Sequence, residues 1–252
     1  MNRTDYGKYL FGTDRKRLEE LAIFEIGGLG TWDGKGAPII DSLPQRKAKR
    51  VIYRGIDNRA CPYIFGISPV NPEEYRPRSK RMLKEHVGNK EGIDSLTIRW
   101  SGWDVPYPFS NGSFDEFHSH MVTSSLIGPE QNGYKPTPEG FADEVDRLLK
   151  PRGRVYLSTD LGHFFPHSWE PGSNQRVELA DKLIQRFRTQ GYSINELDAS
   201  RDFQEELQGR DYGVPIKKAS FGPIMPFTYI YSNIEFVLIA TKASHPIKKQ
   251  RC

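Results

Sequence analysis

Short apolar runs alternate with segments of helical spacing along this chain of 252 residues. Strands that alternate with helices build a mostly parallel sheet with helices on both faces, joined by right-handed connections. In such a sheet, ligands bind beyond the carboxyl ends of the strands. The sequence therefore predicts an α/β fold, with strands expected at 22–26, 50–56, 96–100, 114–122, 154–158 and 234–241.

Four segments are predicted to be helical. Residues 137–150 and 174–190 carry apolar side chains at helical spacing, and each is followed by a glycine that ends it. Residues 73–87 are expected to be helical after Pro77. A short helix is expected at 13–22, where Leu18, Leu21 and Ala22 would form one face.

Composition excludes a disulfide framework and disfavours several other classes of protein. A formal charge of +4, carried partly by a basic tail at 244–252, is smaller than a nucleic-acid-binding stripe usually requires. Two cysteines, Cys61 and Cys252, exclude a disulfide framework, and their spacing is unlike that of a zinc site. No apolar run reaches about 18 residues and the first residues are unlike a signal peptide, so we expect a cytoplasmic protein without membrane spans.

Two acidic positions follow predicted strands. Glu25-Ile26-Gly27-Gly28-Leu29-Gly30 reads as a strand that ends in a glycine turn. Glycines let the backbone approach a ligand closely, and the following N–H groups can bind an anionic group. Asp57 ends the next strand, where a carboxylate can accept hydrogen bonds from ribose hydroxyls. Taken alone, each pattern is equally compatible with an ordinary turn.

Two further segments resemble a known family. The run 107–115, YPFSNGSFD, is similar to the loop between the third and fourth strands of class I S-adenosylmethionine-dependent methyltransferases, for which LPFPDNSFD is typical. The block 144–158, EVDRLLKPRGRVYLS, is similar to that family's EVxRVLKPGGRLVLS segment. The resemblance covers roughly residues 20–160 and implies a Rossmann-like, doubly wound, mostly parallel seven-stranded sheet with helices on both faces.

The resemblance implies that S-adenosyl-L-methionine is the cofactor. The glycine turn of the family wraps the methionine part, which places Glu25, Gly27, Gly28 and Gly30 there, and Asp57 would hold the ribose hydroxyls. Adenine would meet Asp104 or its neighbour Trp103, although a one-residue shift relative to Pro108 leaves the contact open. His118 lies near the end of the fourth strand, where the family lines the reactive methyl group.

The resemblance also implies where the reaction would occur. Methyl transfer chiefly requires alignment of a nucleophile with the methyl carbon, and a general base helps where the nucleophile is a hydroxyl. The candidates for this base are histidines at or after the fourth and fifth strands, with His120 preferred over His118, His163 and His167. The tetrapeptide of many amino-directed nucleic-acid methyltransferases is absent, which favours a small-molecule or peptide acceptor.

The organisation expected is one methyltransferase-like domain over 1–252, with no metal and with a homodimer compatible with the sequence. Its core comprises about 20–160 and 174–243, and substrate-lid segments fall at about 58–72, 123–136, 161–173 and 199–232, followed by the tail 244–252. The aromatic residues of 199–232 suit either a substrate wall or plain packing.

Departures from the family pattern leave alternatives open. Leu29 stands where the second glycine of the cofactor motif is expected, and a rival alignment places Val51–Gly55 at the first strand. A protein-binding domain without activity therefore remains as an alternative, and the mild basic charge with the Lys/Arg tail leaves an RNA methyltransferase as another. A dehydrogenase is disfavoured, because the segments 107–115 and 150–153 have no role in it.

Overall fold

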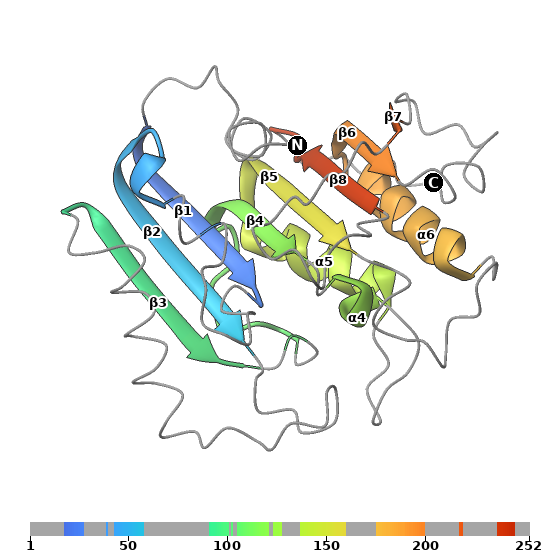
Figure 1. Ribbon diagram of the computed structural model, residues 1–252, viewed down its shortest axis with the longest axis horizontal. Helices are drawn as coiled ribbons and strands as arrows, with labels where there is room; N and C mark the ends of the chain where they lie inside the picture. Colours follow the sequence, from blue (N-terminus) through green and yellow to red (C-terminus); the bar gives the residue numbers. More distant parts are fainter. Residues whose placement is uncertain are drawn as a thin grey trace, which may run out of the picture. The chain divides into compact units, whose positions relative to one another are not determined.

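A computed structural model describes residues 18–27, 39, 43–57, 91–100, 102, 105–120, 123–127, 137–159, 175–199, 217–218 and 236–244 (Figure 1). The chain divides into two compact units. The first unit is Gly7–Tyr107, and the second comprises Met1–Tyr6 and Pro108–Cys252.

The first unit contains three parallel strands in the order β3-β2-β1. Strand β1 spans Leu18–Ile26, β2 spans Ala48–Asp57, and β3 spans Ile93–Arg99, while a 3-10 turn, η1, covers Leu43–Gln45. Ile26 of β1 lies opposite Ile56 of β2, so the carboxyl ends of these strands meet at one edge. The edge is built on a buried apolar core that includes Ile23, Phe24, Tyr53 and Ile56.

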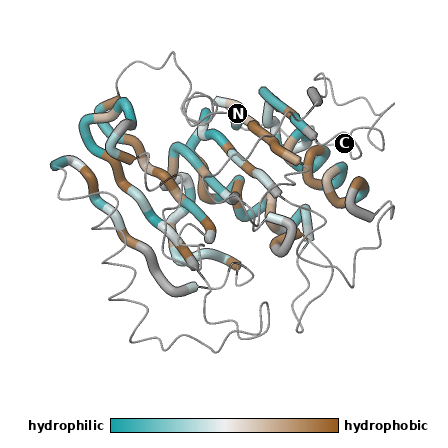
Figure 2. The backbone as a smooth tube through the Cα atoms, viewed as in Figure 1, coloured by the Kyte–Doolittle hydropathy of each residue, from teal (hydrophilic) through white to brown (hydrophobic). Residues whose placement is uncertain are grey.

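The second unit contains five described strands in the order β4-β5-β8-β6-β7. Their bounds are Phe114–His120 for β4, Leu149–Thr159 for β5, Ser193–Ala199 for β6, Lys217–Lys218 for β7 and Phe236–Thr241 for β8. Strands β4 and β5 run parallel, whereas β8 runs antiparallel to both β5 and β6. Figure 2 shows that β8 is hydrophobic over most of its length, as expected for a strand with neighbours on both sides.

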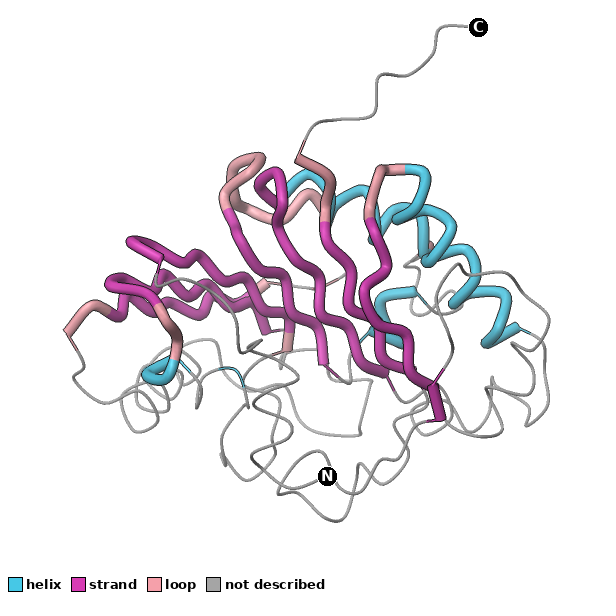
Figure 3. Tube along the Cα trace, turned by 90° about the horizontal axis from the view of Figure 1, so that it is seen from above, coloured by secondary structure: helices cyan, strands magenta, loops and turns pink. Residues whose placement is uncertain are grey.

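Three helices belong to the second unit: α4 at Thr123–Ile127, α5 at Pro138–Leu148 and α6 at Gln175–Thr189. The hydroxyl of Thr137 accepts the backbone N–H of Gly140 at 2.9 Å and caps α5, and Pro138 suits the first helical position. Phe141 of α5 packs edge-on against Phe117 of β4. Helices α5 and α6 lie on the same side of this part of the sheet (Figure 3).

The predicted fold class is confirmed: the chain is an α/β protein of the Rossmann-like type with mostly parallel strands. Seven of the described strands have six or more residues, and β7 has two. The strands expected at 50–56, 96–100, 114–122, 154–158 and 234–241 are confirmed within a few residues. So are the helices expected at 137–150 and 174–190.

The helix expected at 13–22 is wrong over residues 18–22. Leu18, Leu21 and Ala22 belong to β1, in which the six residues from Leu21 to Ile26 are all buried. A parallel strand covered on both faces has a continuous apolar run instead of an alternating pattern. Leu18, Leu21 and Ala22 therefore show helical spacing only because they belong to a strand with many apolar residues.

Other expectations fall on residues that lie outside the described part of the chain. These are the first half of the 13–22 segment, the helix at 73–87, the lid segments 58–72 and 161–173, and the tail 245–252. Strand β6 was not predicted from the sequence, because SINELDA contains only two large apolar residues and a register shift separates Ile194 from Glu196. None of the described helices combines the length and the hydropathy needed to cross a membrane.

Candidate functional site

The glycine turn follows the first strand of the first unit, as the preferred alignment requires. Ile26 is the last residue of β1 and Glu25 stands directly before it. Gly27 comes directly after the strand. Gly27 has a φ of 76°, a left-handed conformation that favours glycine, and donates its N–H to the backbone oxygen of Ile56 at 2.8 Å. The rival alignment is wrong, because Val51–Gly55 lies in the second strand, β2.

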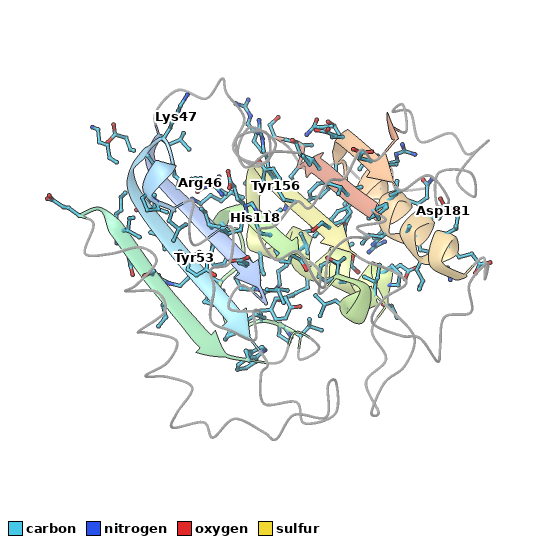
Figure 4. The ribbon with its side chains drawn as sticks, in the orientation of Figure 1. Arg46, Lys47, Tyr53, His118, Tyr156 and Asp181 are labelled. Atoms are coloured by element: carbon cyan, nitrogen blue, oxygen red, sulfur yellow. The ribbon has the colours of Figure 1, made fainter. Side chains whose placement is uncertain are left out.

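The carboxylate of Glu25 is held inside the protein. Its side chain lies beneath the carboxyl edge with 2% of the residue exposed, and its Oε2 accepts the hydroxyl of Tyr53 at 2.7 Å. A buried carboxylate is costly unless hydrogen bonds satisfy it. The site residue Glu25 therefore comes with a partner on β2, Tyr53, which is fully buried and labelled in Figure 4.

Asp57 is the last residue of β2 and lies opposite Arg99 of β3. Glu25 lies opposite Gly55, two residues before Asp57. Both acidic residues therefore belong to the carboxyl edge of the first unit, on adjacent parallel strands. This is the edge at which sheets of this class bind ligands.

The segment that follows β3 is closed by a tyrosine. Tyr107 is buried and donates its hydroxyl to the backbone oxygen of Gly102 at 2.7 Å, so the two ends of 102–107 are joined. Its ring packs against Phe24 of β1, with ring centroids 5.6 Å apart. The expected adenine-binding residues, Trp103 and Asp104, lie between these ends in the sequence and outside the described residues.

Strand β4 of the second unit contains a buried pair of a carboxyl group and an imidazole. His118 Nε2 lies 3.0 Å from Glu116 Oε2, and both side chains are almost completely buried. The imidazole stacks on the ring of Tyr156 in β5, with centroids 4.6 Å apart and planes within 6° (Figure 4). His118 is therefore enclosed between a carboxylate and an aromatic ring, which suits a structural or positioning role better than direct contact with a substrate.

Hydroxyl groups gather where β4 and β5 end. The hydroxyl oxygen of Thr123, at the start of α4, lies 3.1 Å from the backbone oxygen and 3.0 Å from the hydroxyl oxygen of Ser119. It also lies 3.3 Å from the backbone oxygen of Ser158 in β5. All three residues are buried. The cluster ties the first turn of α4 to the ends of both strands.

Five of the ten predicted site residues lie outside the described part of the chain: Gly28, Gly30, Trp103, Asp104 and His163. Glu25, Gly27 and Asp57 share the carboxyl edge of the first unit, whereas His118 and His120 lie in β4 of the second unit. His120 is the last residue of β4 and lies opposite Ser158. The roles expected for all ten residues stay predictions.

The sequence reasoning missed Tyr53, Glu116 and Tyr156. A tyrosine within an otherwise apolar strand is the signal for Tyr53, because a buried hydroxyl needs a hydrogen-bond partner. Glu116 and His118 stand two positions apart in a strand and therefore share a face. This spacing was the available signal for their pairing. Among the described residues, no cluster of histidine, cysteine, aspartate and glutamate is arranged to hold a metal ion.

No protein-family model matches the chain, and no curated protein does. Solved structures similar to it include geranyl diphosphate C-methyltransferase from Streptomyces coelicolor A3(2), with 11% identity over 95% of this chain and 77% of that chain and a TM-score of 0.48. A further one is an S-adenosylmethionine-dependent methyltransferase from Methanosarcina mazei, with 17% identity over 90% and 94% of the two chains and a TM-score of 0.48. A third is the [4+2]-cyclase SpnF, with 17% identity over 96% and 80% and a TM-score of 0.48.

Two of these three proteins are named as methyltransferases.

Proposed function

We propose that this protein binds S-adenosyl-L-methionine at the carboxyl edge of β1 and β2 and transfers its methyl group to a small-molecule or peptide nucleophile. The observation that carries the proposal is the pair Glu25 and Asp57 on adjacent parallel strands, with the left-handed turn at Gly27 directly after the first of them.

The two carboxylates suit different parts of this cofactor. S-adenosylmethionine has an α-ammonium group at one end and a ribose with two hydroxyls near the other. A buried negative charge at Glu25 attracts the ammonium, and Asp57 would accept the ribose hydroxyls. The glycines after Ile26 would let the backbone approach the methionine part without interference from a Cβ atom.

The cofactor would supply a methyl group that is activated by its bond to a sulfonium sulfur. After transfer of the methyl group, this sulfur is left as a neutral thioether. The protein's part is to hold a nucleophile in line with the methyl carbon and to exclude water. His120 at the end of β4 is our candidate for the general base, which would accept the proton of a hydroxyl acceptor. Glu116 and His118 would act behind it as a buried pair that stiffens the strand.

Equilibrium dialysis with labelled S-adenosylmethionine tests the proposal. We expect a micromolar Kd, competition by S-adenosylhomocysteine and none by NAD⁺, which separates this reading from a dinucleotide-binding one. Competition by NAD⁺ alone would contradict it. The salt dependence of acceptor binding separates the two classes of acceptor. The affinity for an RNA acceptor would fall steeply as the salt concentration rises, whereas the affinity for a small-molecule acceptor would not.

A panel of small-molecule and peptide acceptors then tests the role of His120. With any acceptor that takes up the label, His120→Gln should lower the rate of transfer at least about 100-fold while the cofactor Kd stays within about twofold. An unchanged rate would remove His120 from the mechanism and would leave the cofactor site in place.

A further inference from the structure

We propose that Tyr53 is a positioning residue that holds Glu25 in place for the amino-acid end of the cofactor. This inference rests on the proposed function. It concerns a residue of β2 that has no place in either of the motifs on which the family resemblance depends.

The register of the two strands brings the hydroxyl to the carboxylate. Tyr53 lies opposite Ile23, and Glu25 lies opposite Gly55, so the four residues share one face of the sheet. Two residues along a strand correspond to about 6.6 Å, roughly the reach of a tyrosine side chain. Because Gly55 has no side chain, the Tyr53 hydroxyl extends along β2 and meets Glu25 Oε2 at 2.7 Å.

The identity of the donor matters for charge. The Tyr53 hydroxyl donates to one carboxylate oxygen and brings no positive charge of its own, unlike an arginine or lysine side chain at the same position. The bond also fixes the rotamer of Glu25, and Tyr53 itself is immobilised because no part of it is exposed. A charge held in one place costs little reorganisation when an ammonium group arrives.

Glu25 lies two residues before Gly27, at which the glycine turn begins. Phe24, its neighbour, points to the opposite face and packs against Tyr107. Residues of β1 on both sides of the sheet are thus held by tyrosines. Loss of the Tyr53 hydroxyl would remove the contact with Glu25 and would leave the contact between Phe24 and Tyr107 in place.

The variant Tyr53→Phe keeps the ring in the core and removes the hydroxyl. We expect it to raise the Kd for S-adenosylmethionine and S-adenosylhomocysteine about tenfold. The Kd for 5′-methylthioadenosine, which lacks the amino-acid end, should stay within about twofold. A loss of stability alone would not discriminate between these ligands, so the contrast separates positioning from a structural role.

A matched control is available in the second unit. The hydroxyl of Tyr192 also donates to a carboxylate, Asp146 Oδ1, at 3.1 Å. Tyr192→Phe should leave all three Kd values unchanged.

Each outcome bears on one of the two proposals. If the wild-type protein binds none of the ligands, the proposed function is contradicted. If it binds them but Tyr53→Phe weakens all equally, or none, the role of Tyr53 is contradicted. Glu25→Gln keeps an acceptor for Tyr53 and removes the charge. It should weaken the binding of S-adenosylmethionine and S-adenosylhomocysteine, the two ligands with an amino-acid end, at least tenfold. An affinity of this variant for S-adenosylhomocysteine equal to that of the wild type would also overturn the inference.

Discussion

Arg147 of α5 donates from Nη1 to the backbone oxygen of Phe109 at 2.8 Å. The same nitrogen donates to Asn111 Oδ1 at 2.8 Å, and the N–H of Gly112 returns a bond to the backbone oxygen of Arg147. Phe109–Gly112 belongs to one of the two motifs on which the family resemblance depends, and Arg147 belongs to the other. The two motifs are therefore in direct contact in this structure, because Arg147 of α5 holds the loop 109–112 by hydrogen bonds.

Removal of this link should destabilise the protein. Arg147 also binds Glu144, which is almost completely buried, and the hydrogen bond to that carboxylate raises the pKa of Arg147. Arg147→Met leaves Glu144 without its cation, and we expect a loss of about 2–4 kcal/mol in the free energy of unfolding in urea.

Arg186 provides the control for this variant. It pairs with Asp143 on the surface, where about half of each side chain is exposed. Arg186→Met should cost less than about 1 kcal/mol. Equal losses for the two variants would show that Arg147 does no more than an exposed ion pair.

Arg152 occupies a position at which glycine is favoured. Its φ is 64°, and it stands where the family pattern KPGGR has its first glycine. A left-handed conformation costs a non-glycine residue about 1–2 kcal/mol, whereas glycine loses about 0.5–1 kcal/mol in unfolded-state entropy. Arg152→Gly should therefore raise the free energy of unfolding by up to about 1 kcal/mol.

Gly153→Ala should have the opposite effect, because an added Cβ would lie 2.8 Å from the backbone oxygen of Lys150. Thermal unfolding of both variants tests the pair of predictions. A lower Tm for Arg152→Gly than for the wild type would show that other contacts of Arg152 outweigh its backbone strain.

The Glu116–His118 pair should behave as a unit. Glu116→Ala leaves the buried imidazole without its carboxylate, and we expect a loss of about 3 kcal/mol in stability. The double variant Glu116→Leu/His118→Val replaces the pair by apolar residues and should cost less than the sum of the single changes Glu116→Leu and His118→Val. Urea unfolding of the wild type, the two single variants and the double variant gives the coupling energy, and additive losses would mean that the pair does not interact.

Asp94 should make stability depend on acid pH. Hydrogen bonds from Arg54 hold the pKa of Asp94 below its ordinary value of 3.8; the charges of Arg54 and Arg50 act in the same direction, and partial burial opposes them. A lowered pKa stabilises the folded state above 3.8, and this contribution is lost as the pH falls through the folded-state value. The ion pair is half exposed, so the effect should stay below about 1 kcal/mol.

The comparison of wild type with Asp94→Asn isolates this contribution. The wild-type protein should be the more stable of the two at pH 7, and the difference should shrink as the pH is lowered below 3.8. A difference that grows on acidification would have the wrong sign for a lowered pKa.

The parts of the fold that were predictable are those with a strong periodic signal. Helix α5 has a capping threonine, a proline at its first position and buried residues at helical spacing, and β8 is almost wholly apolar. Strand β1 was misread in part because burial on both faces removes the alternation that identifies a strand. Strand β6 escaped notice because Ile194 and Leu197 are not two residues apart, and a register shift lies between them.

The site was predictable only where its residues form a local pattern. Glu25 precedes a glycine turn and Asp57 ends a strand, so they were found from the sequence. Tyr53 was not, because its partner lies 28 residues away and only the register of β1 and β2 brings them together. The same holds for Tyr156, whose stacking on His118 depends on the pairing of β4 with β5.

Calorimetric titration of S-adenosylmethionine into the wild-type protein and into Asp57→Ala tests the central claim most directly. Asp94→Asn, which changes an acidic residue near the amino end of β3 and away from the carboxyl ends of the strands, is the control. We predict micromolar binding to the wild type and to the control, and binding at least tenfold weaker to Asp57→Ala. The absence of binding to the wild type at millimolar cofactor, or equal affinities for wild type and Asp57→Ala, would contradict the cofactor site at this edge.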